Sequence, residues 1–324
     1  MKVDVKENLD LFVENNQILK EEFKWEEDLV TRLAAFFYAQ ENRKADGNAI
    51  RKCYDLIKSN TGIFSIFRDN NITLATLMSL TDDPEEMFRN VKKAYNTLKD
   101  AKFSTSDYLV VVAYQIASNV SPENYSDVTK RAKAFYDGMK VRHRFLTDEE
   151  DYILAVMLGL SDIDVDTGSA NIEKLFDCLR SEFKFDKDSI QTLSHILILA
   201  NKSSEGAQRV IDIQAELEKQ KIHFDKTYSL SLLGLLSLLP DDVGKLVQEV
   251  SEVQSYLQEQ KGFKGISISR DELFLFSVAI VLTYYCESIN SELVASLLSA
   301  GIIDIIITEM MMMVTTMTIV NTIN

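Results

Sequence analysis

Phe103-Ser104-Thr105-Ser106-Asp107 joins an aromatic residue to a polar helix-start signal, and an apolar run follows it. The same order returns after Phe145, Phe185 and Phe224, and in a weaker form after Ile268. The copies are spaced by about forty residues, an interval typical of stacked antiparallel helix pairs. The recurrence therefore predicts an all-α fold, an α-solenoid-like array of tandem helix pairs.

The composition agrees with a helical chain. Only 3 prolines and 11 glycines occur among 324 residues. Proteins use these residues at roughly 5% and 7% on average, and both destabilise helix interiors. Their scarcity favours long helices joined by short turns.

Within each unit the two helices differ in character. The leading helix is apolar on most sides, as in residues 152–158, and the trailing helix is amphipathic, as in residues 172–183. A helix that is apolar all round is a buried one, so the leading helices are expected to form an inner layer. The run Val110-Val111-Val112 could instead be a buried strand, although it lies in an apolar stretch of helical length.

The chain divides into three parts that we expect to form one continuous, elongated unit. Residues 1–70 carry three helical apolar patterns and predict an N-terminal helical cap. Residues 71–286 hold the helix-pair repeats of about forty residues. Residues 287–324 form an apolar segment that closes the other end. We expect each recurrent phenylalanine to be buried between neighbouring units.

The charge excludes some classes of partner. The formal net charge is −15, which would repel nucleic acid unless basic residues were segregated. The densest basic stretch, from Lys130 to Arg144, falls on one predicted helix and is interpreted as a solvated face. The acidity also gives no attraction to anionic lipid.

Cysteine use indicates a reducing compartment. Cys53, Cys178 and Cys286 are far apart, and no C-x-x-C occurs. Reduced, buried thiols in a cytoplasmic protein are the natural interpretation. Residues 1–8 are charged and have no apolar core, so no secretory signal is expected.

Several segments resemble a bacterial family, mostly from Gram-positive organisms, that is catalogued only as a domain of unknown function. The similar segments are residues 64–68, residues 136–147, and Glu149-Glu150-Asp151-Tyr152 with Leu158-Gly159-Leu160. Arg144 stands where a proline is common in that family. The resemblance covers nearly the full chain and implies a cytosolic helical protein without an established activity. It carries over no catalytic residue.

The sharpest local signal is Asp162-Ile163-Asp164-Val165-Asp166 followed by Glu173. Acids at relative positions 1, 3, 5 and 12 match the ligand spacing of a calcium-binding EF-hand loop. However, Thr167 occupies the position that needs glycine, and Gly168 comes one residue later. We therefore favour a turn with a helix N-cap over a cation site.

The histidines and known motifs give no enzyme assignment. His195 lies on an apolar helix and is expected to be a satisfied core residue rather than a ligand or general base. His143 and His223 precede recurrent phenylalanines, which favours a role at helix C-termini. No G-x-S-x-G, P-loop or G-x-G-x-x-G occurs, although a Ser–His–acid set could assemble in space. No catalytic, cofactor-binding or metal-binding residue is predicted.

The C-terminal segment contains the run Met310-Met311-Met312-Met313 and lacks lysine and arginine after Arg270. A buried closing helix, a dimer or partner surface, and membrane insertion are its three interpretations. Asp304 and Glu309 make membrane insertion the least favoured, because carboxylates are costly in a bilayer.

The sequence as a whole predicts a non-catalytic cytoplasmic interaction scaffold, because stacked helix pairs present curved surfaces that bind macromolecules. The partner would be another protein or a second copy of the chain. The alternative is an enzyme or small-ligand binder with a pocket between the N-terminal cap and the repeats. A deep pocket with convergent polar groups would favour that alternative.

Overall fold

A computed structural model describes residues 3–68, 71–182, 187–224, 230–288 and 307. Within these ranges the chain forms α-helices and two short 3-10 helices and contains no strand, so the strand alternative for Val110-Val111-Val112 is wrong. The elements are α1 (Val3–Glu22), α2 (Asp28–Gln40), α3 (Gly47–Ser59), η1 (Ile66–Arg68), α4 (Asn71–Ser79), α5 (Pro84–Asp100), α6 (Asp107–Asn119), α7 (Tyr125–Arg142), α8 (Tyr152–Leu160), α9 (Val165–Glu182), α10 (Lys187–Leu199), α11 (Ser203–Lys219), α12 (Leu230–Ser237), α13 (Val243–Glu259), η2 (Gly265–Ser267) and α14 (Arg270–Ser288).

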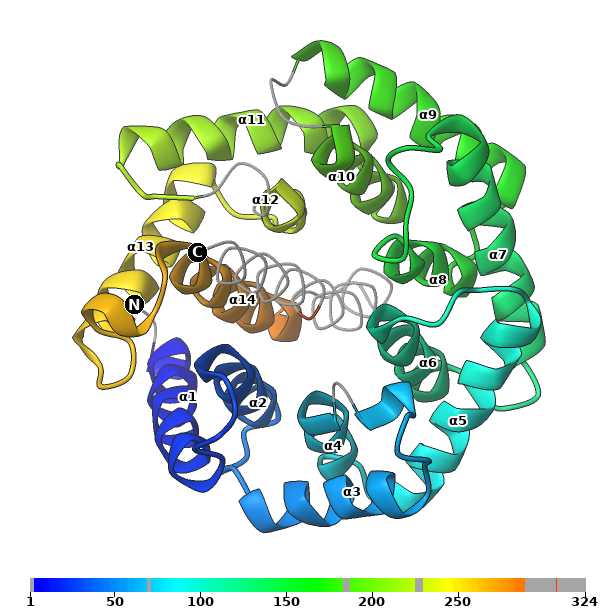
Figure 1. Cartoon of the computed structure of the whole chain (residues 1–324). Coiled ribbons are helices and arrows are strands. Elements are labelled where there is room, and N and C mark those ends of the chain that lie inside the picture. Colours follow the sequence, from blue (N-terminus) through cyan, green and yellow to red (C-terminus); the bar gives the residue numbers. More distant parts are fainter. Residues whose placement is uncertain (1–2, 69–70, 183–186, 225–229, 289–306, 308–324) are drawn as a thin grey trace, which may run out of the picture.

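The helices form pairs that follow one another around a ring (Figure 1). The odd-numbered helices make the outer layer, and the even-numbered helices make the inner layer. Helix α1 contacts both α13 and α14, so the first pair meets the last. The array is therefore closed rather than elongated. A constant rotation from one pair to the next gives such curvature, and here it brings the ends together.

The two layers have the burial that the sequence predicts. In the inner helix α8, every residue from Tyr152 to Gly159 is buried. In the outer helix α13 one stripe is buried, formed by Leu246, Val247, Val250, Val253 and Leu257. An inner helix is covered by its outer partner and by its neighbours in the ring, so it needs apolar side chains on most sides.

The recurrent phenylalanine lies just after a specific helix end. At the end of α5, Lys102 has a φ of 71°, and the Phe103 N–H donates to the Leu98 carbonyl at 3.2 Å. At the end of α11, Lys221 has a φ of 58°, and the Ile222 N–H donates to the Leu217 carbonyl at 3.0 Å. This left-handed turn satisfies free helix carbonyls and directs the chain back toward the core.

The burial of the recurrent positions is only partly as expected. Phe103, Phe224 and Ile268 are buried, and Phe185 lies outside the described residues. Phe145 is 97% exposed, so its predicted burial is wrong. Helix α7 ends at His143 with a φ of −129° instead of a left-handed residue. The chain then turns differently, and Phe145 points to solvent.

Two outer-helix arginines hold the ends of inner helices in the same way. Arg131 on α7 and Arg209 on α11 each bind three carbonyls just beyond the following inner helix or at its end. The acceptors are Gly159 (3.0 Å), Ser161 (2.6 Å) and Ile163 (2.8 Å) for Arg131, and Ser237 (2.9 Å), Leu239 (2.8 Å) and Asp241 (2.8 Å) for Arg209. Arg131 therefore departs from the solvated face predicted for the basic stretch.

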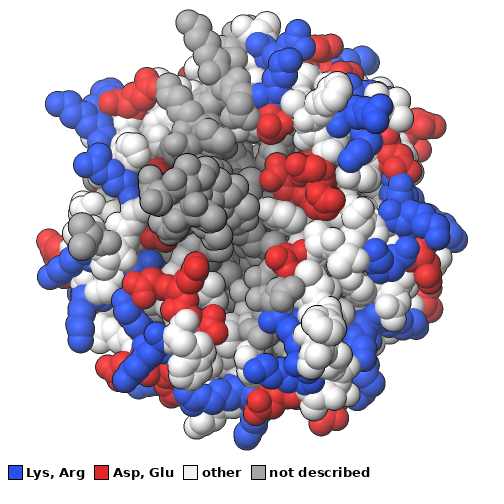
Figure 2. Space-filling model, viewed as in Figure 1, with Lys and Arg blue, Asp and Glu red and all other residues white. Residues whose placement is uncertain are grey.

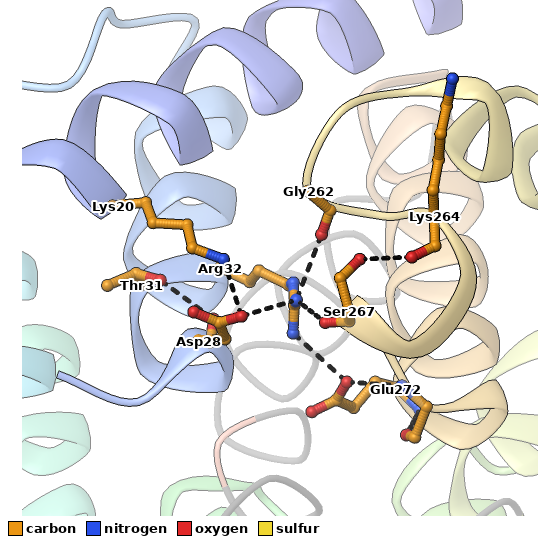
Figure 3. A network of polar contacts seen from close by, with 9 residues as sticks. Lys20, Asp28, Thr31, Arg32, Gly262, Lys264, Ser267 and Glu272 are labelled. Carbon is orange, nitrogen blue, oxygen red and sulfur yellow. Dashed lines mark hydrogen bonds and ion pairs between the residues drawn. The ribbon is translucent and has the colours of Figure 1, made fainter. Parts of the chain in front are cut away.

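A buried polar network joins the two ends of the ring (Figure 3). Arg32 of α2 lies 3.3 Å from Glu272 of α14 and donates to the carbonyls of Gly262 and Ser267. Glu272 also accepts from the Ser269 N–H at 3.0 Å, while the Ser269 hydroxyl accepts from the Glu272 N–H at 3.1 Å. This reciprocal capping box starts α14 and fixes the carboxylate for Arg32.

The C-terminal expectations mostly fall outside the described residues. These include the Met310–Met313 run and the acids Asp304 and Glu309. Ile307 is described and is buried. No helix in the described part of the chain is long and apolar enough to cross a membrane.

Candidate functional site

A small cavity lies between α7, α9 and α10, with a volume of about 20 Å³. This is room for about one water molecule. Polar and apolar side chains line it together: Phe135, Met139, Arg142, His143, Ser169, Ile172, Glu173, Phe176, Gln191 and His195. Two of the three histidines of the chain meet here, a convergence that the sequence does not reveal.

His195 is buried in α10 and keeps one nitrogen without a partner. Its Nδ1 lies 2.6 Å from the Gln191 carbonyl, so Nδ1 carries the proton and donates. Its Nε2 is then an acceptor, and it has no hydrogen-bond partner. Burial lowers the pKa of His195 to about 4, so the ring is neutral at pH 7. The predicted core position is confirmed, but only half of the ring is satisfied.

Gln191 connects this helix to the start of α8. Its Nε2 donates to Asp151 Oδ1 at 3.0 Å, while the Asp148 N–H donates to Asp151 Oδ2 at 3.1 Å. The Gln191 Oε1 has no hydrogen-bond partner. Burial, helped by the negative charge of Glu150, raises the pKa of Asp151 to about 8. Asp151 is therefore mostly protonated at pH 7.

His143 and Glu173 are hydrogen-bonded to each other on the other side of the cavity. His143 Nε2 lies 3.0 Å from Glu173 Oε2, and Arg142 Nε lies 3.9 Å from the same oxygen. The imidazole packs on Phe176 with a ring-centroid distance of 4.4 Å. His143 is also the C-cap residue of α7, which confirms its predicted place at a helix end. The third histidine, His223, lies elsewhere and pairs with Asp271 at 3.3 Å.

The acidic loop before α9 has a structural role. Asp164 Oδ1 accepts from the Thr167 N–H at 2.9 Å, which confirms the turn and N-cap interpretation. Glu173 is held by His143 and Arg142 and faces the cavity rather than the loop. A Cβ on Gly168 would lie 2.6 Å from the Ile163 side chain, so close packing explains this glycine. Among the described residues, no group of three or more potential metal ligands is present.

The arrangement offers a neutral imidazole and an amide oxygen as acceptors in a largely apolar cavity. Ser169, His143 and Glu173 also line it, so a Ser–His–acid set does come together. Within the described contacts no hydrogen bond joins Ser169 to His143, and these residues do not form an assembled triad. Gln191 and Asp151 were not singled out from sequence. The sequence offered one signal for them, because each is a polar residue within or next to an otherwise apolar inner helix.

Comparisons with known proteins identify relatives of the chain. A family model described as "Protein of unknown function (DUF4003)" matches residues 15–321. The chain is similar to the "Uncharacterized protein YeaA" of Bacillus subtilis (strain 168), with 24% identity over 284 residues. That match covers 83% of this chain and 82% of the relative. No solved structure matches.

Proposed function

The chain belongs to the DUF4003 family, and we propose that it is a non-catalytic cytoplasmic scaffold that binds another protein through one face of the ring. The face is formed by the connections that lead from each outer helix to the following inner helix. Outer helices of successive antiparallel pairs run in the same sense, so the described parts of these connections lie at one end of the pairs. We call this surface the loop face.

The exposed apolar side chains carry the proposal. Among the described residues, every large apolar side chain that is mostly exposed lies in a loop-face connection or in the last turn of the helix before it. They are Trp25 (72% exposed), Ile63 (73%), Phe64 (96%), Val141 (85%) and Phe145 (97%). Single exposed apolar residues are ordinary, but their restriction to one face marks an interaction surface.

The chemistry around these residues suits a protein partner. Tryptophan, other aromatic residues and arginine dominate the energetics of protein interfaces. Val141 and Phe145 stand beside the exposed Arg142 and Arg144, so this part of the face matches a partner segment with apolar and acidic residues. Figure 2 shows basic and acidic side chains mixed around the rim, with acidic ones nearer the centre. On the described part of the side viewed in Figure 2, such mixing gives no continuous basic surface for nucleic acid or anionic lipid.

The size of this cavity weighs against the binding of a metabolite-sized ligand or substrate in it. Ligand pockets have volumes of about 300–1,000 Å³, whereas this cavity has room for about one water molecule. It also lies between α7, α9 and α10, away from the junction between residues 1–70 and the repeats. The convergence of His143, Glu173 and Ser169 is the observation that keeps a catalytic role as the second candidate.

Site-specific photo-crosslinking in cells tests the scaffold. A crosslinking residue at Phe64 or Phe145 is expected to capture the same protein, because both positions lie on the loop face. The matched control is a crosslinker at Glu123, an exposed residue between α6 and α7 at the opposite end of the pairs. Equal capture from both faces, or no shared product from Phe64 and Phe145, would contradict the proposal.

A binding assay with the captured partner follows. Phe64→Ser and Phe145→Ser are expected to weaken binding by at least about tenfold each, the effect of losing an interface anchor. Glu123→Ser should leave the affinity unchanged. Because Phe64 and Phe145 make little contact in the free protein, all three variants should keep the wild-type melting temperature.

A further inference from the structure

The cavity beside His195 contains two buried acceptors that the protein leaves unsatisfied. His195 and Gln191 are each 1% exposed and lie one helical turn apart on α10. Both line the same cavity, and neither His195 Nε2 nor Gln191 Oε1 has a hydrogen-bond partner. Nearly all buried polar groups in native proteins are hydrogen-bonded, so two such atoms at one cavity indicate a missing donor.

The cost of leaving the two atoms unpaired supports this reading. A buried acceptor without a donor loses the hydrogen bonds that it made to water in the unfolded chain and so destabilises the folded state. The Nδ1–H bond to the Gln191 carbonyl fixes the tautomer, so His195 cannot present a proton on Nε2 while it stays neutral. The volume of about 20 Å³ holds one water-sized group.

The charges around the cavity select a neutral group over a cation. Among the described residues that line it, the one carboxylate is Glu173, which is already engaged by His143 and Arg142. A cation would therefore bring an uncompensated charge into a buried site. A hydroxyl group is neutral and both donates and accepts. It can donate to His195 Nε2 and accept from the Gln191 amide nitrogen once the amide rotates. The rotated Oε1 then accepts from the protonated Asp151, which replaces the bond from Nε2 to Asp151 Oδ1.

We propose that this cavity is a binding site for one neutral hydroxyl group, held between His195 Nε2 and Gln191. A water molecule occupies it in the resting protein. The hydroxyl of an alcohol as small as methanol can replace this water, because the cavity admits little more than a water-sized group. The site is independent of the loop-face function, and its occupant is recognised through hydrogen bonds rather than charge.

A crystal structure of the full chain at a resolution that shows ordered waters is the first test. We expect density for one water within hydrogen-bond distance of both His195 Nε2 and Gln191. An empty cavity, a metal ion at His195, or a direct bond between the two side chains would overturn the proposal.

Nitrogen-15 NMR of the histidine rings is the second test, with methanol and acetonitrile as small probes. Methanol donates a hydrogen bond and acetonitrile does not, so only methanol should shift His195 Nε2 saturably. The apparent affinity for methanol should be about tenfold lower in Gln191→Leu. It should be unchanged in Ser194→Ala, because the Ser194 hydroxyl donates to the Ile190 carbonyl in the wild-type protein. Equal responses to both probes, or none to methanol in the wild-type protein, would overturn the hydroxyl site.

Discussion

Arg32 and Glu272 are separated by 240 residues in the chain, yet Arg32 Nη1 lies 3.3 Å from Glu272 Oε2 with both side chains buried. The pair joins the first helix pair to the last. Aromatic packing supports the same junction, since Phe12 of α1 contacts Phe263 and Phe276 with ring centroids 5.2 and 5.3 Å away. Closure of the ring is thus built from specific contacts.

A double-mutant cycle measures the closing contact. Arg32→Met should destabilise the protein by about 3–5 kcal/mol, because it leaves the Glu272 carboxylate buried without its cation. Combined with Glu272→Gln, the cycle should give a coupling energy of about 1–3 kcal/mol in chemical denaturation. The control cycle uses the exposed pair Arg89–Glu85, 4.0 Å apart, whose coupling should stay below about 0.5 kcal/mol. Equal coupling energies in both cycles would contradict a stabilising role for the buried Arg32–Glu272 pair.

The arginines that hold inner-helix ends provide a second prediction. Arg131→Lys and Arg209→Lys should each destabilise the protein by about 2 kcal/mol, because one ammonium cannot reach three carbonyls in a fixed fork geometry. Arg180→Lys, at an exposed position on α9, should change stability by less than about 0.5 kcal/mol. Urea denaturation gives the three values. A similar small effect at all three positions would mean that the bonds from Arg131 and Arg209 to the three carbonyls do not stabilise the fold.

The recurrent phenylalanines should differ in their contribution to stability. Phe103→Ala should cost about 3–5 kcal/mol, because Phe103 is buried and packs on Tyr152 with ring centroids 4.9 Å apart. Phe145→Ala should cost less than about 0.5 kcal/mol, since its side chain is in solvent. Thermal melts of the two variants compare the positions directly. A comparable loss in both would show that Phe145 is buried in solution.

The buried acid next to α8 predicts a pH dependence of stability. The folded pKa of Asp151 is about 8, above its ordinary value of 3.8, so the folded state holds an extra proton between these values. The contribution of Asp151 to the free energy of unfolding therefore falls as the pH rises from 3.8 toward 8. His195 acts oppositely, because its folded pKa of about 4 lies below 6.5, and stability rises from pH 4 to 6.5. Of these two groups, only Asp151 still changes the stability above pH 6.5.

Asp151→Asn isolates this effect, because the amide resembles the protonated acid. The stability of the variant relative to wild type should rise by up to about 2 kcal/mol between pH 6.5 and 8, at about 1.4 kcal/mol per pH unit. Denaturation at a series of pH values provides the difference. A constant difference across this range would mean that Asp151 is already ionised at pH 6.5.

Repetition and polarity made the helical architecture predictable, whereas closure was not. The interval between Phe103 and Phe224 and the apolar run before Gly159 are local signals, and they correctly predict paired helices in two layers. Ring closure depends on the rotation between pairs and on contacts such as Arg32 with Glu272, which leave no local pattern. Phe145 is exposed because His143 has a φ of −129° instead of the left-handed φ found at Lys102 and Lys221.

The candidate site was less predictable for a related reason. His143 lies at the end of α7, Glu173 lies on α9, and His195 lies on α10. Their meeting depends on how these three helices pack. The apolar environment that lowers the pKa of His195 is visible in sequence only as neighbouring leucines and isoleucines. Asp151 looked like one member of an acidic run, and only the fold shows that it is buried while Glu149 and Glu150 are not.

Hydrogen–deuterium exchange of the protein with and without its captured partner tests the central claim most directly. The claim is that one face of a closed ring of helix pairs carries the binding function. We expect new protection in residues 23–27, 60–68 and 141–147, which hold the exposed apolar side chains of the loop face. Protection confined to residues 80–83, 120–124 and 161–164, at the opposite end of the helix pairs, would contradict the account.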